Sequence, residues 1–483
     1  MNHSVRKPPA CVAVMALFLF SGSALATNGY FTHGVGTQSK GMAGTGVGSN
    51  ADMGAIMSAS NPALGVFTHD SWEVGVAIFS PRRSYEASPS SFDGDLMQIA
   101  PGVFLPSFSI ASRKVDSSSE YFPIPFVAKN WSLQNDANIT MNFYGRGGMN
   151  TDWDSPDASV TSYFCGGDPS QNEPPATGTG PYCGSNYHPA GDGTAGVNLM
   201  QAFLVLNYSA KVNDNFAWGA GPVFAAQMFE AKGIWAFAPI SQTFANSGGQ
   251  AFPPTLTNND ADTSIGIGFG AGLWWGISDT VSLGLAYQSK MSMGEFDDYS
   301  ELFAESGGFD IPSSIKAGLS FVATPQLRVN VDVEHTAYGD VDSIANPMIN
   351  MLGCSSPALP FGGTDIESCL GGARGPGFGW DDMTTYKLGF EWAQDDSTTW
   401  RFGYSYGEQP IQSADVLFNV LAPGVMEQHI TFGLTKKAGN GGIWTFSFMY
   451  APENDVVGPN MFDPSQTITL SMDQLEFEVA YRF

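Results

Sequence analysis

Long hydrophobic runs are rare in this 483-residue chain, and this limits how it can be built. Ala10–Phe20 is an apolar run of eleven residues behind Arg6 and Lys7, and Ala24-Leu25-Ala26 supplies small residues after it. This pattern predicts a secretory signal peptide over residues 1–26, too short for a stop-transfer helix. No later stretch offers about 18 consecutive apolar residues, so no transmembrane helix is expected.

Basic residues are also scarce. The chain has 20 Lys and Arg against 46 Asp and Glu, a formal net charge of −26. Loss of Arg6 and Lys7 with the signal peptide would give −26 − 2 = −28. Nucleic acid requires a basic surface, so this class of partner is excluded. Most of the acid lies in segments predicted below as loops, where it is either simply hydrated or binds cations.

Cysteine is equally limited. After the signal peptide four remain, Cys165, Cys183, Cys354 and Cys369, as two close pairs in Gly/Pro/Ser-rich stretches. Proximity in an exported chain favours Cys165–Cys183 and Cys354–Cys369 disulfides, each worth about 3 kcal/mol. A metal site is the competing interpretation, but C-x-x-C spacing and a neighbouring histidine pair are both missing. We therefore expect no metal and no other cofactor.

The sequence contains no recognisable catalytic motif. Its histidines after the signal peptide are dispersed: His33, His69, His188, His335 and His429. No motif nominates a serine nucleophile, so a hydrolase is not expected. Gly44–Gly48 is glycine-rich like a phosphate-binding loop, but no strand precedes it and no Lys-Ser/Thr follows it.

The segment Asn28–Phe67 differs from the rest of the chain. It has nine glycines between Asn28 and Gly65, and its formal charges are Lys40 and Asp52. It is too apolar for a solvated linker and too rich in glycine for a regular helix or strand. We predict a compact irregular plug that needs walls supplied by the remaining chain.

From Trp72 to the last residue, segments that alternate apolar and polar side chains recur. In Leu327–Glu334, for example, every second residue is apolar and the others are polar. A period of two with one apolar face indicates a β-strand between two environments. Fourteen strands are predicted: Trp72–Ser80, Ser119–Lys129, Ala137–Gly147, Gly196–Val212, Asn215–Ala231, Asp262–Ile277, Thr280–Gly294, Phe309–Ala323, Gln326–Tyr338, Met383–Ala393, Thr398–Gly407, Met426–Lys437, Gly441–Ala451 and Ser471–Phe483.

The connections between these strands alternate between short and long. Thr324–Pro325 is short and Gly339–Asp382 is long; Ala438–Asn440 is short and Pro452–Leu470 is long. Tight turns on one side and long loops on the other are typical of outer-membrane barrels, whereas a soluble sandwich has no reason to alternate in this way. We predict an all-β fold: a 14-stranded antiparallel transmembrane β-barrel over residues 69–483, with residues 27–68 as an N-terminal hatch in its lumen.

The last predicted strand carries a further outer-membrane feature. Phe477, Val479, Tyr481 and the terminal Phe483 place apolar side chains at every second position. This resembles the C-terminal signal by which the barrel assembly machinery recognises its substrates. Aromatic residues near strand ends fit interfacial girdles.

Five stretches of this sequence resemble the FadL-type long-chain fatty acid transporters of Gram-negative outer membranes, a family that includes hydrocarbon-uptake channels. They are Asn28-Gly29-Tyr30-Phe31, Gly34–Gly48, Asn61-Pro62-Ala63, Ile311–Leu319 and Trp400–Tyr406. Asn61-Pro62-Ala63 matches the NPA motif that ends the family's hatch. The resemblance implies a monomeric outer-membrane protein, not an enzyme, whose surroundings are lipid and lipopolysaccharide.

The resemblance also implies a transport route. A hydrophobic ligand would be captured at the external loops and bind beside the hatch N-terminus, at Asn28, Tyr30 and Phe31. It would then leave sideways through a gap at a kinked third strand. The kink is expected at Tyr144, Gly145, Gly147 and Gly148, although these glycines could simply end the strand. Long-chain fatty acids are the expected ligands; aromatic or alkane hydrocarbons are the alternative, and a general porin or adhesin is less favoured.

Two basic residues could meet a carboxylate ligand. Lys316 and Arg328 alternate with apolar neighbours, so both should face the lumen, because charges facing lipid would cost about 2–4 kcal/mol. They could instead pair with acidic residues of the wall. Apolar loop segments at Val416–Leu421 and Met348–Leu352, with Phe244 and Phe252, could capture the ligand or pack together as a cap.

Overall fold

The computed structural model describes residues 28–91, 96–100, 103–106, 110, 112–153, 195–359, 363–439 and 441–483. The predicted signal peptide, together with Cys165 and Cys183, lies outside the described residues. Within them, no helix has both the length and the apolar character needed to cross a membrane.

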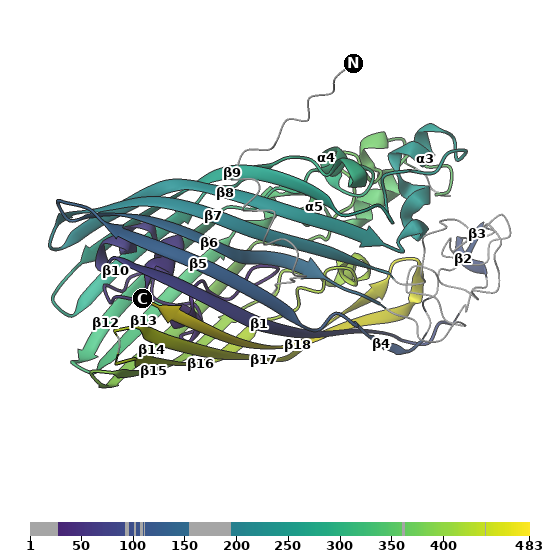
Figure 1. Cartoon of the computed structure of the whole chain (residues 1–483). Coiled ribbons are helices and arrows are strands. Elements are labelled where there is room, and N and C mark those ends of the chain that lie inside the picture. Colours follow the sequence, from purple (N-terminus) through teal and green to yellow (C-terminus); the bar gives the residue numbers. More distant parts are fainter. Residues whose placement is uncertain are drawn as a thin grey trace, which may run out of the picture.

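The described strands form a closed antiparallel barrel (Figure 1). One sheet has 16 strands; β4 and β11 are short additions at its rim, which leaves 16 − 2 = 14 strands in the wall. The ring closes where β10 pairs with β9 and β1 pairs with β18. The predicted fold is confirmed.

The strands are β1 Ser71–Ala87, β4 Lys114–Asp116, β5 Phe122–Ser132, β6 Ala137–Asn150, β7 Gly196–Asn213, β8 Phe216–Lys232, β9 Asp262–Gly276, β10 Val281–Gln288, β11 Ser292–Met293, β12 Ser314–Thr324, β13 Leu327–Thr336, β14 Met383–Asp395, β15 Thr398–Gly407, β16 Gln428–Lys437, β17 Ile443–Asn460 and β18 Asp463–Arg482, with a separate hairpin of β2 Leu96–Ala100 and β3 Val103–Pro106.

Short helices occupy the lumen and the long loops. Those of the hatch are α2 Thr37–Lys40, η1 Ala55–Ala59 and η2 Pro62–Phe67. Those of the loops are η5 Trp235–Ile240, α3 Gln242–Asn246, η6 Asp297–Tyr299, α4 Ala304–Gly307, η7 Tyr338–Asp340, α5 Asp342–Ala345, η8 Met348–Gly353, η9 Ile366–Ser368, η10 Ser413–Asp415 and α6 Val416–Asn419.

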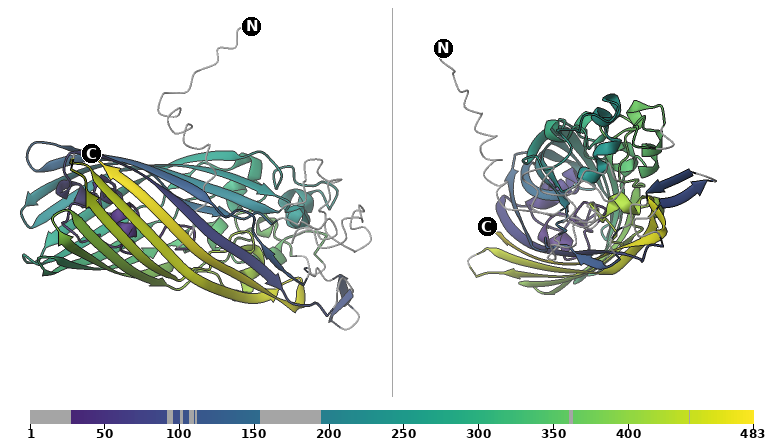
Figure 2. Two further views of the ribbon diagram at one scale, coloured as in Figure 1. Left: turned by 60° about the horizontal axis from the view of Figure 1, so that its bottom comes forward. Right: turned by 90° about the vertical axis from the view of Figure 1, so that its right-hand side faces the viewer.

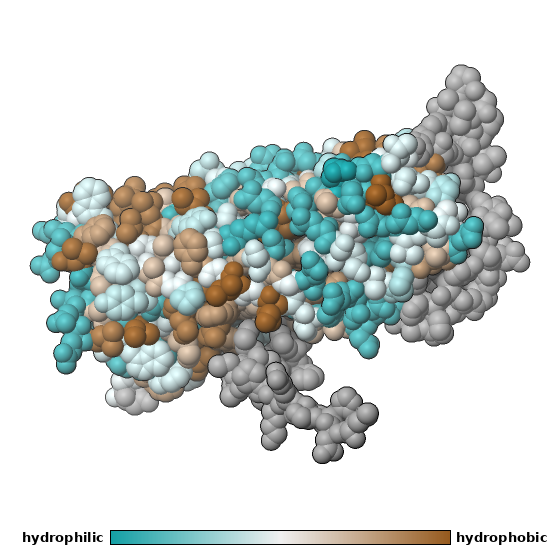
Figure 3. All heavy atoms as spheres, turned by 90° about the horizontal axis from the view of Figure 1, so that it is seen from above, coloured by the Kyte–Doolittle hydropathy of each residue, from teal (hydrophilic) through white to brown (hydrophobic). Residues whose placement is uncertain are grey.

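Side chains alternate across the wall as expected for a barrel in lipid. On β1, Trp72, Val74, Val76 and Ile78 are 37–45% exposed on the outside, whereas Glu73 faces the lumen and is buried. In Figure 3, hydrophobic residues gather on the half of the barrel that carries the short turns, and the other half is mainly hydrophilic. A continuous apolar outer face of this kind is typical of barrel strands in lipid, so this band marks the membrane.

The two ends of the barrel differ. Short turns lie at one end, and the loop helices gather at the other, for example α3, α4 and α5 (Figure 1). Seen along its axis, the wall forms a ring with the hatch inside it (Figure 2). Cys354 and Cys369 form a disulfide at the long-loop end, which confirms this predicted pair.

One predicted loop is wrong. Residues 452–470 continue β17 and β18 far beyond the membrane band, and only Met461 and Phe462 separate these strands. The register shifts between Ala451 and Asn454, which accommodates Pro452. A bulge lets an antiparallel pair continue past a proline, so the loop-like composition did not end the strands.

Candidate functional site: the hatch and the wall of the lumen

The body of the hatch lies with its backbone directly on the backbone of the wall. A Cβ on Gly284 of β10 would come within 1.9 Å of the Val47 carbonyl oxygen. A Cβ on Gly403 of β15 would lie 2.2 Å from the Met42 carbonyl carbon. We call these wall positions and their equivalents the glycine belt: Gly219, Gly272, Gly284, Gly318, Gly389, Gly403 and Gly433, on strands β8 to β16. Only glycine permits such close approach.

Asn61 of the predicted hatch motif joins the hatch to this belt. Its Oδ1 accepts a hydrogen bond from the Ala63 amide at 3.0 Å, so it caps η2 in front of Pro62. Its Nδ2 donates to the carbonyl of Val47 at 2.8 Å and to that of Leu273 on β9 at 3.1 Å. One fully buried side chain thus fixes the start of η2, an earlier hatch turn and the wall.

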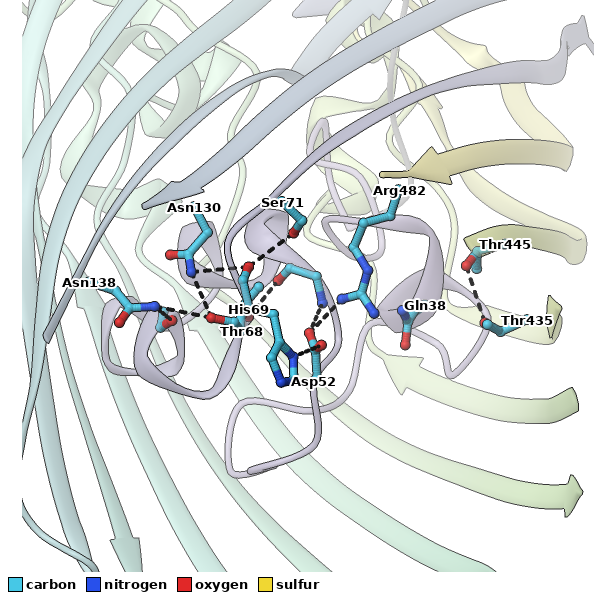
Figure 4. Close-up of polar contacts among 12 residues, drawn as sticks. Gln38, Asp52, Thr68, His69, Ser71, Asn130, Asn138, Thr435, Thr445 and Arg482 are labelled. Carbon is cyan, nitrogen blue, oxygen red and sulfur yellow. Dashed lines mark hydrogen bonds and ion pairs between the residues drawn. The ribbon is translucent and has the colours of Figure 1, made fainter. Parts of the chain in front are cut away.

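Polar contacts close the hatch at the short-turn end. Asp52 lies between His69 and Arg482, and its carboxylate contacts both (Figure 4). Asn130 and Asn138 each donate from Nδ2 to the carbonyl of Thr68, at 2.6 and 3.1 Å. The exit of the hatch into β1 is therefore held from both sides of the strand.

The first residues of the hatch act as an extra strand along β6. The Thr32 amide donates to the Arg146 carbonyl at 2.9 Å, and the Gly148 amide donates to the Tyr30 carbonyl at 3.0 Å. Phe31 forms a bridge with Gly147. Backbone hydrogen bonds of this kind are the usual means by which a peptide adds to a sheet edge.

That edge of β6 is available because β5 diverges from it. Among the described residues, the ladder between β5 and β6 runs from Ser132↔Asn138 to Phe126↔Tyr144 and ends there. The remaining part of β5, which includes Pro123 and Pro125, pairs with β1. Proline lacks an N–H and is confined to unladdered edges. On the other side of β6, pairing with β7 continues, with a register shift between Gly145 and Gly147.

An aromatic cluster covers the hatch start from the long-loop side. The Tyr30 ring lies 5.4 Å from Tyr338 and 6.0 Å from Trp380, measured between ring centroids. The Tyr338 hydroxyl donates to the Asn28 carbonyl at 2.5 Å. Arg146 lies over the Phe31 ring at 4.4 Å, a cation–π contact. The predicted ligand residues Asn28, Tyr30 and Phe31 are therefore buried under the loops.

A small cavity lies between the hatch and the wall beside this cluster. It is lined by hatch residues 58–60 and Pro62, and by Tyr144, Arg146, Tyr287 and Lys316 from the wall. Apolar lining comes from Val205, Val223 and Ala286. The predicted residues Tyr144 and Lys316 thus meet at one cavity, together with Arg146, the residue at the β6 register shift.

Cations outnumber carboxylates around this cavity. Glu334 contacts Lys316 at 3.1 Å, Lys387 at 2.7 Å and Arg146 at 3.4 Å. Asp332 on the same strand accepts from the amides of Gly46 and Val47, at 2.8 and 3.0 Å. Three cations against two carboxylates leave an excess of one positive charge in a buried site.

Arg328, the other predicted cation, lies elsewhere. It faces the lumen nearer the short turns, donates to Ser320 Oγ at 2.9 Å, and does not line the cavity. The predicted assembly residues are on the outer face of β18, where Phe477 and Phe483 are exposed and Val479 and Tyr481 are half-buried. Their roles remain predictions.

The long loops form a compact cap. Val416, Leu417, Phe418, Val420 and Leu421 are all buried. Asp415 accepts from the Met348 amide at 2.6 Å, and burial raises the pKa of its carboxyl. Arg374 binds Asp365 at 2.7 Å and lowers the pKa of that carboxyl. On η8, however, Ile349 and Leu352 are 59% and 46% exposed.

Comparisons with known proteins agree with this architecture. A family model described as outer membrane protein transport protein (OMPP1/FadL/TodX) matches residues 184–420. This match and the barrel fold both support assignment of the chain to the FadL-type family. Its members are transport proteins rather than enzymes, and the barrel places this one in the Gram-negative outer membrane, with the long loops outside and the short turns in the periplasm. A comparison with curated proteins finds no significant match.

Solved structures of FadL-type proteins share the fold. The Pseudomonas putida toluene transporter TodX has 14% sequence identity and a TM-score of 0.60, over 93% of this chain and 98% of its own. A Pseudomonas aeruginosa FadL homologue has 14% identity and a TM-score of 0.59, over 94% and 99%. The Ralstonia pickettii toluene transporter TbuX has 14% identity and a TM-score of 0.54, over 92% and 98%.

Two features of this FadL-type site escaped the sequence analysis although signals for them exist. Pro123 and Pro125 stand in a predicted strand, and prolines there indicate an edge. The belt glycines occupy lumen-facing positions of several predicted strands, where side chains normally fill the barrel. Both signals mark places where the backbone of the wall, rather than its side chains, meets the hatch.

Proposed function

We propose that this protein takes up long-chain fatty acids and releases them sideways into the outer membrane. The barrier for such a molecule is the polysaccharide layer outside the cell, whereas the hydrocarbon below it is a good solvent. A protein that serves this purpose needs an apolar landing site, an interior site and a side exit. It needs no water-filled pore.

Exposed apolar side chains on the external cap support the first step. Ile349 and Leu352 project from η8, beside the disulfide between Cys354 and Cys369. Apolar residues exposed together outside the membrane suggest a binding surface. The buried segment 416–421 supports the cap instead, which was the alternative interpretation of that segment.

The position of Arg146 is the observation that carries the proposal. This residue stands at the register shift of β6, beside the end of the β5–β6 ladder, and it lines the cavity with Lys316. A carboxylate bound there would use the excess positive charge. The acyl chain would then lie against Tyr144 and Val205, next to the interrupted ladder.

Displacement of the hatch start would open the exit. Tyr30 and Thr32 complete the edge of β6 through two backbone hydrogen bonds. Each is worth only about 1 kcal/mol, so a ligand that binds better to the displaced form can shift this equilibrium. The edge beyond Phe126↔Tyr144, where the described β5–β6 ladder ends, is then the side exit.

Uptake of radiolabelled oleate and toluene tests the ligand class. In a strain that lacks its own transporter, Lys316→Met should lower oleate uptake about tenfold, as expected for loss of roughly 1.4 kcal/mol of charge pairing. Toluene uptake should not change. Lys232→Met, which alters an exposed lysine paired with Glu230, is the matched control. Equal uptake of oleate by both variants would contradict the fatty acid assignment.

Aromatic hydrocarbons are the second candidate. The rings of Tyr30, Phe31, Tyr338 and Trp380 form a continuous aromatic cover over the hatch start. Flat aromatic ligands gain edge-to-face contacts in such surroundings. Tyr338→Leu should therefore lower toluene uptake more than oleate uptake if hydrocarbons are the natural ligands.

A further inference from the structure

We infer that the hatch has a second function, that of a clamp which brings the first and last strands together when the barrel closes. The seam between β1 and β18 joins the two ends of the barrel sequence through fifteen paired positions, from Glu73↔Arg482 to Ala87↔Ile468. Every other pair of neighbouring strands in the wall joins strands that follow one another along the chain. Closing so long a loop carries the largest entropic cost.

Two buried carboxylates on the last strand have no counter-ion in the wall beside them. Glu476 and Glu478 both face the lumen and are each 2% exposed. Across the seam they face Phe79 and Ala77 of β1, and on the other side Met449 and Ser447 of β17. None of these neighbours is a cation, so the wall alone would bury two like charges side by side.

The hatch supplies the missing charge. Lys40 Nζ lies 3.1 Å from Glu476 and 2.6 Å from Glu478, and the lysine is itself only 4% exposed. Thr37 donates from Oγ1 to Glu478 at 2.6 Å. In the part of the chain that the structure describes, Lys40 is the one cation within 4.0 Å of either carboxylate. A buried charge without its partner strongly disfavours the closed arrangement.

The other end of the hatch is tied to the first strand. Only residues 68–70 separate η2 from the start of β1. Asp52, also in the hatch, binds Arg482 near the end of β18. When Lys40 and Asp52 bind β18, the last strand is therefore tethered to β1 through the hatch, a path much shorter than the chain around the barrel.

This arrangement gives β1 and β18 a high effective concentration relative to each other when the seam closes. Lys40 and Glu478 are 438 positions apart in the sequence, yet each is only a short distance from one side of the seam. Tethered partners associate far more readily than partners joined by a long flexible chain. Hatch contacts elsewhere in the wall do not bridge the seam, because they touch strands that already follow one another along the chain.

A crosslink across the seam measures closure directly. Val76→Cys with Val479→Cys places cysteines at directly paired positions of β1 and β18. In the full-length protein, pulse-chase labelling in cells followed by oxidation reports when these positions meet. We expect Lys40→Gln to form the crosslink at least about threefold more slowly, because the tethered contact is lost.

Two further variants decide the interpretation. Lys40→Glu with Glu478→Lys keeps one cation between two carboxylates and should restore the rate. Gln38→Ala, in the same helix α2, removes the contact from Arg401 on β15 at 2.7 Å, away from the seam. The seam of the Gln38→Ala variant should close at the rate of the parent protein. A wild-type rate for Lys40→Gln, equal slowing by Gln38→Ala, or no rescue by the reversed pair would each overturn the proposal.

Discussion

The start and the body of the hatch are held by the same barrel in different ways. Residues 28–32 follow the edge of β6, with backbone hydrogen bonds from Thr32 and to Tyr30 along that strand and aromatic rings above them. Residues 41–63 rest on the glycine belt, where hatch backbone, or a hatch side chain such as Asn61, leaves little or no room for a Cβ on the wall. In the body, the Gly46 and Ala43 amides also donate to Asp332 and Thr431 of the wall, and Asn61 donates to the Leu273 carbonyl.

This difference indicates which part of the hatch can move. Contacts at a strand edge can be broken one at a time, and water or ligand can replace them. The body instead fits many wall positions at once, so its displacement would leave buried carbonyl and amide groups without partners. We expect the start to exchange between positions while the body remains a fixed floor.

The largest expected effect comes from breaking the fit of the body. Gly403→Val places a branched side chain where a Cβ alone would be 2.2 Å from the Met42 carbonyl carbon. Overpacking against backbone that cannot shift should cost roughly 3 kcal/mol or more. The folded, heat-modifiable form should be strongly reduced on a gel. Gly439→Val is the control, because a Cβ there meets nothing within 4 Å.

A large loss of transport is expected if the side exit is sealed. Pro125 pairs with Val76 of β1, so its nitrogen is expected to face the β6 side, where a ladder partner is not required. Pro125→Val adds a donor and lets the β5–β6 ladder extend, at about 1 kcal/mol for each new bond. Oleate uptake should fall about fivefold while the amount of folded protein is unchanged.

Pro452→Val is the matched control for this change. Pro452 also lies within a wall strand, but on β17, which β18 and β1 separate from β5 in the sheet order. Its substitution should leave uptake unaltered. If Pro125→Val transports at the parental rate, the ligand does not leave between β5 and β6.

A moderate effect is expected from the hatch motif. Asn61→Ala removes three hydrogen bonds and leaves the Val47 and Leu273 carbonyls and the Ala63 amide to find other partners. The free energy of unfolding in urea should fall by about 2 kcal/mol, and uptake should decrease while the barrel still assembles. Asn50→Ala alters an exposed asparagine of the same hatch and should change neither the free energy of unfolding nor uptake.

The smallest effect should be confined to the hatch start. Gly29 has a φ of +65°, and a Cβ there would lie 2.5 Å from the Tyr338 hydroxyl oxygen. Gly29→Ala should therefore loosen the start by about 1–2 kcal/mol. Hydrogen exchange at the Thr32 and Gly148 amides should become about tenfold faster. The Ala43 amide of the hatch body, which donates to Thr431 of the wall, should keep its parental exchange rate.

Much of the architecture could be predicted from the sequence because barrel strands in lipid must alternate. Leu327–Glu334 shows the alternation in its composition, and the structure places it in β13. The alternation of short and long connections then gave the orientation and the external position of Cys354 and Cys369.

The rest depended on contacts that a single sequence does not display. The outer part of the β17–β18 hairpin contains Pro452, Pro459 and Asp455, which are typical of loops, yet pairing continues around a bulge. The cavity combines Lys316 with Arg146, which lies inside the stretch 144–148 where the kink was predicted. Arg328 has the same alternating context as Lys316 but lies nearer the other end of the wall.

The glycine belt has a consequence for the whole cell envelope. A seal made by main chain against main chain does not depend on rotamers, so thermal motion of side chains does not open a leak through the floor. We expect the bacterium to display many copies of such a protein without admitting antibiotics or losing solutes from its periplasm.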